Sequence, residues 1–183
     1  GDYAHDGDYW QFPEATSVPK PLQQPHPPIW VAARAPITYD YAVKHGCNIM
    51  SWPLTRPISE LETYLERLQT ALDDNPGKER PIFSAMRHTC VYDDKKDRMV
   101  PIEAAQRQLA QFENLFKNSG GVNNGFPAMI DLETVANRDE YHPDMLNENL
   151  MFGTPAEVIE NLRLYDNLGV AQFTYYASLG IGM

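Results

Sequence analysis

The 183-residue sequence has no apolar stretch that approaches the roughly 20 residues needed to cross a bilayer. It also lacks an excess of basic residues, since 15 Lys and Arg stand against 25 Asp and Glu, a formal net charge of −10. Binding a phosphate backbone requires a basic face, so nucleic-acid binding is not expected. Residues 1–6 are polar and show no charged-then-apolar leader pattern, so we expect a cytoplasmic protein without membrane contact.

Cysteine is scarce and histidine is not clustered. The two cysteines, Cys47 and Cys90, lie in segments that resemble strands, so two reduced thiols that pack as small apolar groups are expected. The five histidines form no H-x-H or H-x-x-x-H pair, and no metal site is predicted. No G-x-G-x-x-G follows an apolar run, which disfavours a dinucleotide-binding Rossmann unit.

Residues 1–28 are rich in proline and aromatic side chains. Asp6-Gly7 is a strong signal for a two-residue hairpin turn, and aromatic residues lie on both sides of it. The prolines that follow exclude helix and central strand, because proline lacks the backbone N–H that both structures use. We therefore expect a hairpin followed by an extended segment as one unit, with the remaining domain at 29–183.

From residue 29 onward, short apolar runs alternate with helical patterns. Strands are predicted at 29–33, 47–51, 82–92 and 172–177, where apolar or β-branched residues follow one another. Helices are predicted at 36–46, 59–72, 105–116, 144–149 and 154–169. Ser59 with Glu62, and Thr154 with Glu157, have the spacing of capping boxes at two of these helices.

This alternation predicts an α/β fold with parallel strands joined by right-handed crossovers. An open doubly wound sheet and part of a (β/α)8 TIM barrel both fit the pattern. Four strands are too few to close a barrel, which needs about eight. The hairpin at the start and the stop directly after a strand both resemble cut ends, which favours a partial barrel from a longer protein.

Two stretches resemble the bacterial luciferase-like flavin-dependent monooxygenases. The first runs from Gly7-Asp8-Tyr9-Trp10-Gln11-Phe12-Pro13 through Pro19-Lys20-Pro21-Leu22-Gln23-Gln24-Pro25-His26-Pro27-Pro28-Ile29-Trp30. In that family a hairpin insertion ends in a similar proline-rich motif and leads into a barrel strand. The second is Phe152-Gly153-Thr154-Pro155-Ala156-Glu157-Val158-Ile159, which is similar to the helix before the family's final strand. The match is loose over residues 93–150.

The resemblance implies a TIM barrel of which this chain supplies approximately strands 5–8. It also implies an enzyme that uses reduced FMN, delivered by a separate flavin reductase, and O2 to oxidise a small organic substrate. Some relatives use F420 for hydride transfer instead, and that cofactor is kept as an alternative. A non-catalytic truncated barrel that acts as a binding module is a further alternative. The chain alone is expected to be inactive, because the family's catalytic residues in the first four strands are absent from it.

Active sites of such barrels lie at the carboxyl ends of the strands. Ala33, Arg34, Ala35 and Pro36 follow the first strand and begin a helix, whose N-terminus suits a phosphate group. The small alanines would allow the phosphate of FMN to approach the backbone, and Arg34 would add a positive charge. Relatives often have Gly or Ser here, so hydroxyl contacts are in doubt. A plain turn with a solvated Arg34 is the alternative.

Further candidates end the other strands. Met50, Ser51 and Trp52 are predicted to line a flavin or substrate pocket, with core packing as the alternative. Arg87 and His88 are adjacent in a strand, so one of them points inward; a buried arginine needs a partner, either the cofactor or a carboxylate elsewhere in the barrel. His88 is not assigned as a catalytic base. Core packing is favoured for three residues of the last strand: Tyr175, Tyr176 and Ser178.

An isolated half-barrel would expose unpaired strand edges and an apolar inner face. Self-association is therefore expected, most simply as a homodimer whose halves cover each other.

Overall fold

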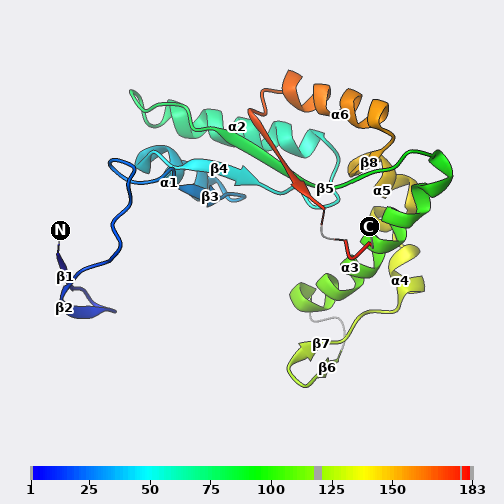
Figure 1. Cartoon of the computed structure of the whole chain (residues 1–183), viewed down its shortest axis with the longest axis horizontal. Helices are drawn as coiled ribbons and strands as arrows, with labels where there is room; N and C mark the ends of the chain where they lie inside the picture. Colours follow the sequence, from blue (N-terminus) through cyan, green and yellow to red (C-terminus); the bar gives the residue numbers. More distant parts are fainter. Residues whose placement is uncertain (1, 118–120, 178, 182–183) are drawn as a thin grey trace.

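The computed structural model describes residues 2–117, 121–177 and 179–181 of the chain, and Ser178 lies outside these described residues. The backbone forms a parallel sheet with helices on one face, a second group of helices beyond one end of the sheet, and an N-terminal hairpin (Figure 1). The predicted α/β class with parallel strands is therefore confirmed.

Five parallel strands make up the sheet: β3 (Trp30–Ala32), β4 (Asn48–Ser51), β5 (Phe83–Val91), β8 (Met151–Gly153) and β9 (Gln172–Tyr176). The long strand β5 pairs with β4 and β9 along its first part, and with β8 at its end, where Val91 lies opposite Gly153. The sequence predicted only four of these strands. β8 was missed because three residues next to a helix-capping motif give no pattern of their own.

Helices α1 (Pro36–His45), α2 (Ser59–Asp73) and α6 (Pro155–Asn167) cover one face of the sheet (Figure 1). Their apolar residues pack on the strand residues that point to that face, Ile49, Phe83 and Ala85, in a single buried cluster. Several residues on the other face, among them Trp30, Met50 and Met86, are only partly buried. Parallel sheets are normally covered on both faces, so this second face is unusual among the described residues.

The helix ends follow the sequence, with one exception. Pro36 begins α1, Gly46 ends it at φ 67°, and Thr154 and Glu157 form the predicted capping box of α6. The capping box predicted at Ser59 is wrong. Ser59 is already inside α2, because the chain turns at Pro57 and the Glu60 and Leu61 N–H groups donate to the carbonyls of residues 57 and 58.

Residues 93–150 form a second helical region. It contains η1 (Lys95–Arg98), α3 (Met99–Lys117), α4 (Leu132–Ala136), η2 (Asp139–Tyr141) and α5 (Pro143–Asn149), with a small hairpin of β6 (Val122–Asn123) and β7 (Phe126–Pro127). The short helix predicted near residues 144–149 is confirmed as α5. This region has its own buried cluster, built around Ile102, Val135 and Leu146.

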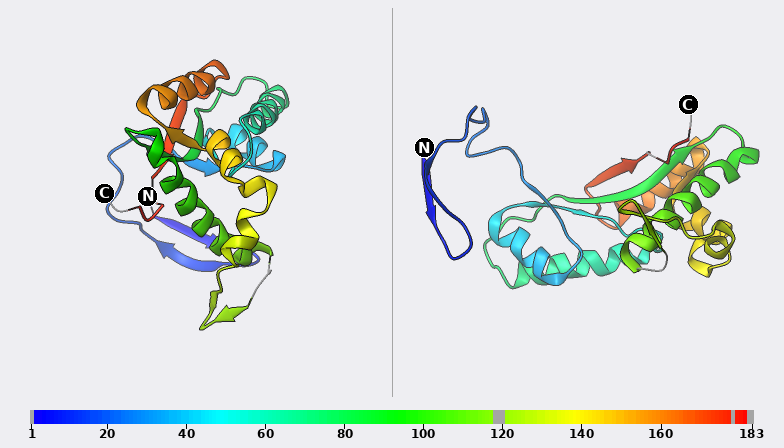
Figure 2. Two further views of the ribbon diagram at one scale, coloured as in Figure 1. Left: turned by 90° about the vertical axis from the view of Figure 1, so that its right-hand side faces the viewer. Right: turned by 90° about the horizontal axis from the view of Figure 1, so that it is seen from below.

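The N-terminal hairpin consists of β1 (Tyr3–Asp6) and β2 (Gln11–Ala15) and stands apart from the sheet at the end of an extended segment (Figures 1 and 2). The hairpin is as predicted, but the two-residue turn is not. Asp6 pairs with Gln11, so the loop spans residues 7–10 and closes with a hydrogen bond from the Gly7 N–H to the Trp10 carbonyl. Gly7 has no positive φ, which a two-residue turn at that position would require.

Candidate functional site

The carboxyl ends of β3, β4, β5 and β9 meet at one edge of the sheet, because all four strands run in the same direction. The loops that follow them bring together residues that are far apart in the sequence. In α/β sheets this edge is where ligands bind.

Hydrogen bonds hold the start of the loop after β3, and the residues that follow are exposed to solvent. The Ala33 N–H donates to the Met50 carbonyl at 3.0 Å, and the Ala33 carbonyl accepts from the Ser51 hydroxyl at 2.8 Å. Ala33 is buried, whereas Arg34 and Ala35 are exposed. Within the described residues, no side chain of the N-cap residue Ala35 pairs with the first N–H groups of α1. Pro36 has no N–H and the Thr38 N–H donates to the Ala35 carbonyl at 2.9 Å, so the loop presents a helix N-terminus without a side-chain cap beside a cationic residue.

The three residues predicted to line a pocket point in different directions. Ser51 faces the helices, is 1% exposed, and pairs with the Tyr39 hydroxyl at 2.8 Å. Burial raises the pKa of Tyr39 to about 12, so the hydroxyl remains protonated at neutral pH. Ser51 therefore serves to hold the Ala33 loop. Met50 lies on the sheet face away from these helices, and Trp52 begins the loop after β4.

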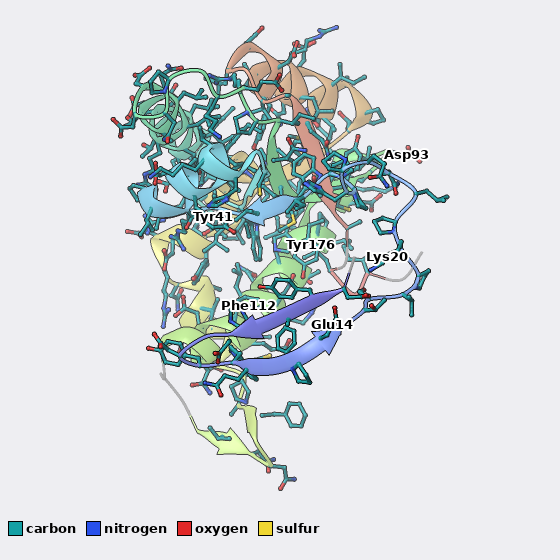
Figure 3. The ribbon with its side chains drawn as sticks, turned by 90° about the vertical axis from the view of Figure 1, so that its left-hand side faces the viewer. Glu14, Lys20, Tyr41, Asp93, Phe112 and Tyr176 are labelled. Atoms are coloured by element: carbon teal, nitrogen blue, oxygen red, sulfur yellow. The ribbon has the colours of Figure 1, made fainter. Side chains whose placement is uncertain are left out.

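Trp52 lies at the centre of an aromatic cluster. Its ring meets those of His88, Phe112 and Tyr176 edge-on, at centroid distances of 5.5, 6.1 and 5.5 Å. The His88 and Tyr176 rings stack at 4.5 Å. These residues come from the loop after β4, from β5, from α3 and from β9, and Figure 3 labels Phe112 and Tyr176. We call these four residues the aromatic cluster.

The polar atoms of this cluster are incompletely paired. Gln108 of α3 donates to the Tyr176 hydroxyl at 3.2 Å. Within the described residues, Trp52 Nε1, His88 Nδ1 and Gln108 Oε1 are buried and have no hydrogen-bond partner. A buried polar atom without a partner is uncommon in folded proteins and calls for an explanation. Here three such atoms occur in one place.

His88 is neutral at physiological pH. The residue is 3% exposed, and burial lowers the pKa of its ring from 6.5 to about 4. The Tyr176 backbone opposes this shift, and the positive charge of Arg87 adds to it. A neutral imidazole has one donor and one acceptor nitrogen, and because the ring already donates to the Tyr176 backbone, the unpaired Nδ1 is left to accept a hydrogen bond.

Arg87 points to the opposite side of β5 and is fully buried. Its Nε donates to the Tyr165 hydroxyl at 2.8 Å, and one of its terminal nitrogens donates to the Leu54 carbonyl at 2.9 Å. Burial lowers its pKa. The partners expected for this arginine were a cofactor or a distant carboxylate. Within the described residues its partners are neutral oxygens, which tie β5 to α6 and to the loop after Trp52, and its other terminal nitrogen is buried without a partner, so the expected cofactor or carboxylate stays a prediction.

The remaining candidates separate in a similar way. Tyr176 belongs to the aromatic cluster, whereas Tyr175 is 63% exposed, so the core packing expected for Tyr175 is wrong. Strand alternation explains the difference, because neighbouring residues of β9 point to opposite faces.

Both cysteines are free thiols. Among the described residues, no group of three His, Cys, Asp or Glu side chains could hold a metal, and no helix is long and apolar enough to span a membrane.

Two residues of the site were not found from the sequence. Gln108 and Phe112 lie one turn apart on α3, and Phe112 was assigned only to the inner face of a helix. Their position depends on how α3 packs over the strand ends, which no local pattern reports. One surface hollow of about 580 Å³ lies away from the strand ends, among η1, α5, β8 and α6, and another of about 460 Å³ lies between α1 and α2, where Pro36 and Ile37 line it.

Comparison with known proteins gives consistent matches. Residues 1–172 match the family model of the luciferase-like monooxygenases. The oxygenase component of the flavin-dependent trigonelline monooxygenase of Acinetobacter baylyi is 36% identical over 99% of the chain and 50% of its own length. The uncharacterized protein y4vJ of Sinorhizobium fredii is 26% identical over 87% of the chain and 45% of its own length. The chain thus spans about half the length of the curated relatives it matches.

Solved structures support the same fold. An F420-dependent secondary alcohol dehydrogenase superposes with a TM-score of 0.65 at 21% identity, over 95% of this chain and 49% of that one. The oxygenating constituent of 3,6-diketocamphane monooxygenase from Pseudomonas putida, in complex with FMN, gives 0.63 at 16% identity, over 97% and 52%. With the family model matched over nearly all of its length, the chain belongs to the luciferase-like monooxygenase family.

Proposed function

We propose that β3, β4, β5 and β9 are the fifth to eighth strands of a (β/α)8 barrel in a flavin-dependent monooxygenase that oxidises a small organic substrate. The observation that carries the proposal is the 36% identity, over 99% of the chain, to the oxygenase component of a flavin-dependent monooxygenase. The partly buried sheet face agrees with it, since in a closed barrel that face would meet the other strands. On this view the chain alone is inactive, and its strand edges favour self-association.

The loop Ala33–Pro36 fits the phosphate of FMN. The first N–H groups of α1 are not capped by the Ala35 side chain, and a helix N-terminus attracts anions. Ala33 and Ala35 leave the backbone accessible, and the exposed Arg34 is close in sequence to these donors. The Ser51 hydroxyl donates to the Ala33 carbonyl and is itself paired with the Tyr39 hydroxyl. These contacts fix the backbone of the loop before a phosphate binds.

Bound reduced flavin would supply the electrons that split O2, with one oxygen atom passing to the substrate and the other leaving as water. The residues of this chain would bind and orient the reactants. The aromatic cluster would exclude water from the strand ends, and neutral His88 would offer a hydrogen bond without adding charge. Because the Acinetobacter relative is an oxygenase component, we propose that a separate reductase delivers the reduced flavin.

A binding experiment tests the cofactor site. The protein, expressed from its complete reading frame, should quench FMN fluorescence, and Arg34→Ala should weaken FMN binding about tenfold, the effect of losing one hydrogen bond to a charged group. Arg80→Ala is the matched control, since Arg80 is exposed and precedes β5 at the opposite edge of the sheet. Equal losses in both variants would contradict a phosphate site at residues 33–36. Retention of F420 in preference to FMN would favour the F420-dependent alternative.

An activity experiment tests the reaction. With FMN, NADH and a flavin reductase, the complete protein should incorporate one atom of ¹⁸O2 into its substrate, detected by mass spectrometry. Trigonelline is the first compound to try, because the 36%-identical relative is named for it. Flavin binding without oxygen transfer to any compound of a broad panel would favour the binding-module alternative. No flavin binding at all would refute the proposal.

A further inference from the structure

The aromatic cluster combines two features that are rarely found together in a protein core. Its four rings are closely packed, yet Trp52 Nε1, His88 Nδ1 and Gln108 Oε1 are buried without partners among the described residues. Indole Nε1 can only donate a hydrogen bond, and an amide oxygen can only accept one. The three atoms therefore require a group that has both kinds of polar atom or that allows them to rearrange.

Helix α3, which covers the aromatic cluster, packs mainly with the buried cluster of residues 93–150. Phe112 and Gln108 reach the strand ends from α3, whereas the buried residues of α3, such as Ile102 and Ala105, pack with α4 and α5. Glu113, also on α3, binds Arg138 at 2.7 Å and the Tyr141 hydroxyl, which ties α3 to η2. The helix thus packs within residues 93–150, in a cluster that meets the strands at Cys90 and Phe152 and is separate from the cluster under α1, α2 and α6.

We propose that α3 is a plug: Phe112 and Gln108 occupy the place of a planar aromatic substrate that carries a hydrogen-bond acceptor, and the substrate displaces them when it binds. This inference rests on the proposed function, since it names the substrate class for the same strand ends. The place held by the Phe112 ring is flat and lies edge-on to Trp52, at 80° between the ring planes. A substrate ring in that place has the same geometry against the indole.

The polar atoms define what the substrate must carry. Once α3 moves, Trp52 Nε1 becomes a donor for a carboxylate, carbonyl or ring nitrogen, and His88 Nδ1 pairs with a second polar atom. Phe112 has no such atoms and Gln108 donates to the Tyr176 hydroxyl instead, so the plugged state leaves Trp52 Nε1 and His88 Nδ1 without partners among the described residues. The closed state thus costs the free energy of unpaired groups, and substrate binding removes that cost.

Calorimetric titration of the flavin-free protein, expressed from its complete reading frame, tests the plug. The probe is pyridine-3-carboxylate, and cyclohexanecarboxylate, with the same charge and a similar size, is the comparison. Pyridine-3-carboxylate should bind at least about tenfold more tightly if Trp52 pairs with it beside an aromatic surface. Trp52→Phe, which keeps a ring but deletes the N–H, should weaken its binding about tenfold. Equal affinity for the two acids, or no effect of Trp52→Phe, would overturn the proposal.

The plug predicts that loss of the Phe112 ring increases the affinity for the probe, whereas loss of a side chain that contacts a ligand normally lowers it. Phe112→Ala and the milder Phe112→Leu should tighten binding of pyridine-3-carboxylate, because the closed state no longer competes with it. Gln108→Ala should act in the same direction, whereas Gln111→Ala, on the exposed side of α3, should have no effect. Weaker binding in both Phe112 variants would mean that Phe112 is a wall of the site, and the plug would be refuted. FMN quenching, measured separately, shows whether the flavin role fails independently.

Discussion

The sheet region and the region of residues 93–150 are stabilised in different ways. Under α1, α2 and α6 an apolar cluster surrounds the buried Arg87, which is bound by neutral oxygens, and the strands add a continuous ladder of hydrogen bonds. In residues 93–150 the apolar cluster is accompanied by the carboxylate of Glu113, which is 5% exposed and bound to Arg138 and Tyr141. The strand ladder therefore dominates the first region, whereas a carboxylate with two side-chain partners holds α3 to η2 in the second. That difference suits a scaffold that holds a cofactor and a cover that moves.

Glu113→Ala should give the largest difference in stability between the two regions. It removes two hydrogen bonds to a buried carboxylate, from the Tyr141 hydroxyl and from the one-third exposed Arg138, and should cost about 3 to 5 kcal/mol of the free energy of unfolding. Hydrogen exchange followed by mass spectrometry should show lost protection in residues 93–150, with the strands unaffected. Glu103→Ala, an exposed site on the same helix, is the control. Equal loss of protection in β4 and β9 would mean that the two regions unfold as one.

A pair of leucine substitutions sharpens the same comparison. Leu68 of α2 and Leu146 of α5 are both 0% exposed, one in each core. Replacement of either by alanine should cost about 3 to 4 kcal/mol, through lost burial and the cavity left behind. Leu68→Ala should lower protection throughout the sheet, and Leu146→Ala only in residues 93–150. If the two variants give the same exchange pattern, the division into two regions is incorrect.

The pH dependence of stability tests the contact between the regions at His88. Its ring has a pKa lowered to about 4 by burial, compared with 6.5 in the unfolded chain, so folding favours the neutral form. This contribution is fully present above pH 6.5 and is lost as the pH falls towards 4, because the unfolded chain then takes up a proton that the folded ring does not. The loss is at most about 3 kcal/mol.

Urea unfolding at pH 7.5 and at pH 5 measures this loss. His88→Phe, which cannot titrate, should reduce the difference in unfolding free energy between the two pH values. His45→Gln, at an exposed position, should leave it unchanged. An unchanged difference in His88→Phe would show that the ring is protonated, and hence solvated, in the folded protein.

Most of the scaffold was predictable from the sequence. The strands at 29–33, 47–51, 82–92 and 172–177 each lie within a residue or so of an observed strand, because buried parallel strands appear as apolar runs. Pro36, Gly46 and the capping box of Thr154 and Glu157 mark helix ends through backbone chemistry that is local to them. Such signals do not depend on the rest of the fold.

The second region and the site were less predictable. β8 has three residues and forms only because β5 extends far enough to pair with it. The aromatic cluster depends on where α3 lies, and α3 is positioned by the tertiary contacts of Glu113 and by its packing on α4 and α5. Neither Gln108 nor Phe112 differs in its local sequence from an ordinary helix residue. Only contacts between distant residues give them a role.

The pairing of Val91 with Gly153 brings the two ends of the intervening segment side by side. Paired strands lie about 4.8 Å apart, so residues 92–150 leave the sheet at the end of β5 and return to it in β8 at almost the same point. A segment with adjoining ends can be exchanged between homologous enzymes as a cassette, with the junctions at the ends of β5 and β8. Such chimaeras would combine α3 and its neighbouring helices from one parent with the loop at residues 33–36 from the other. They could separate substrate preference from cofactor preference.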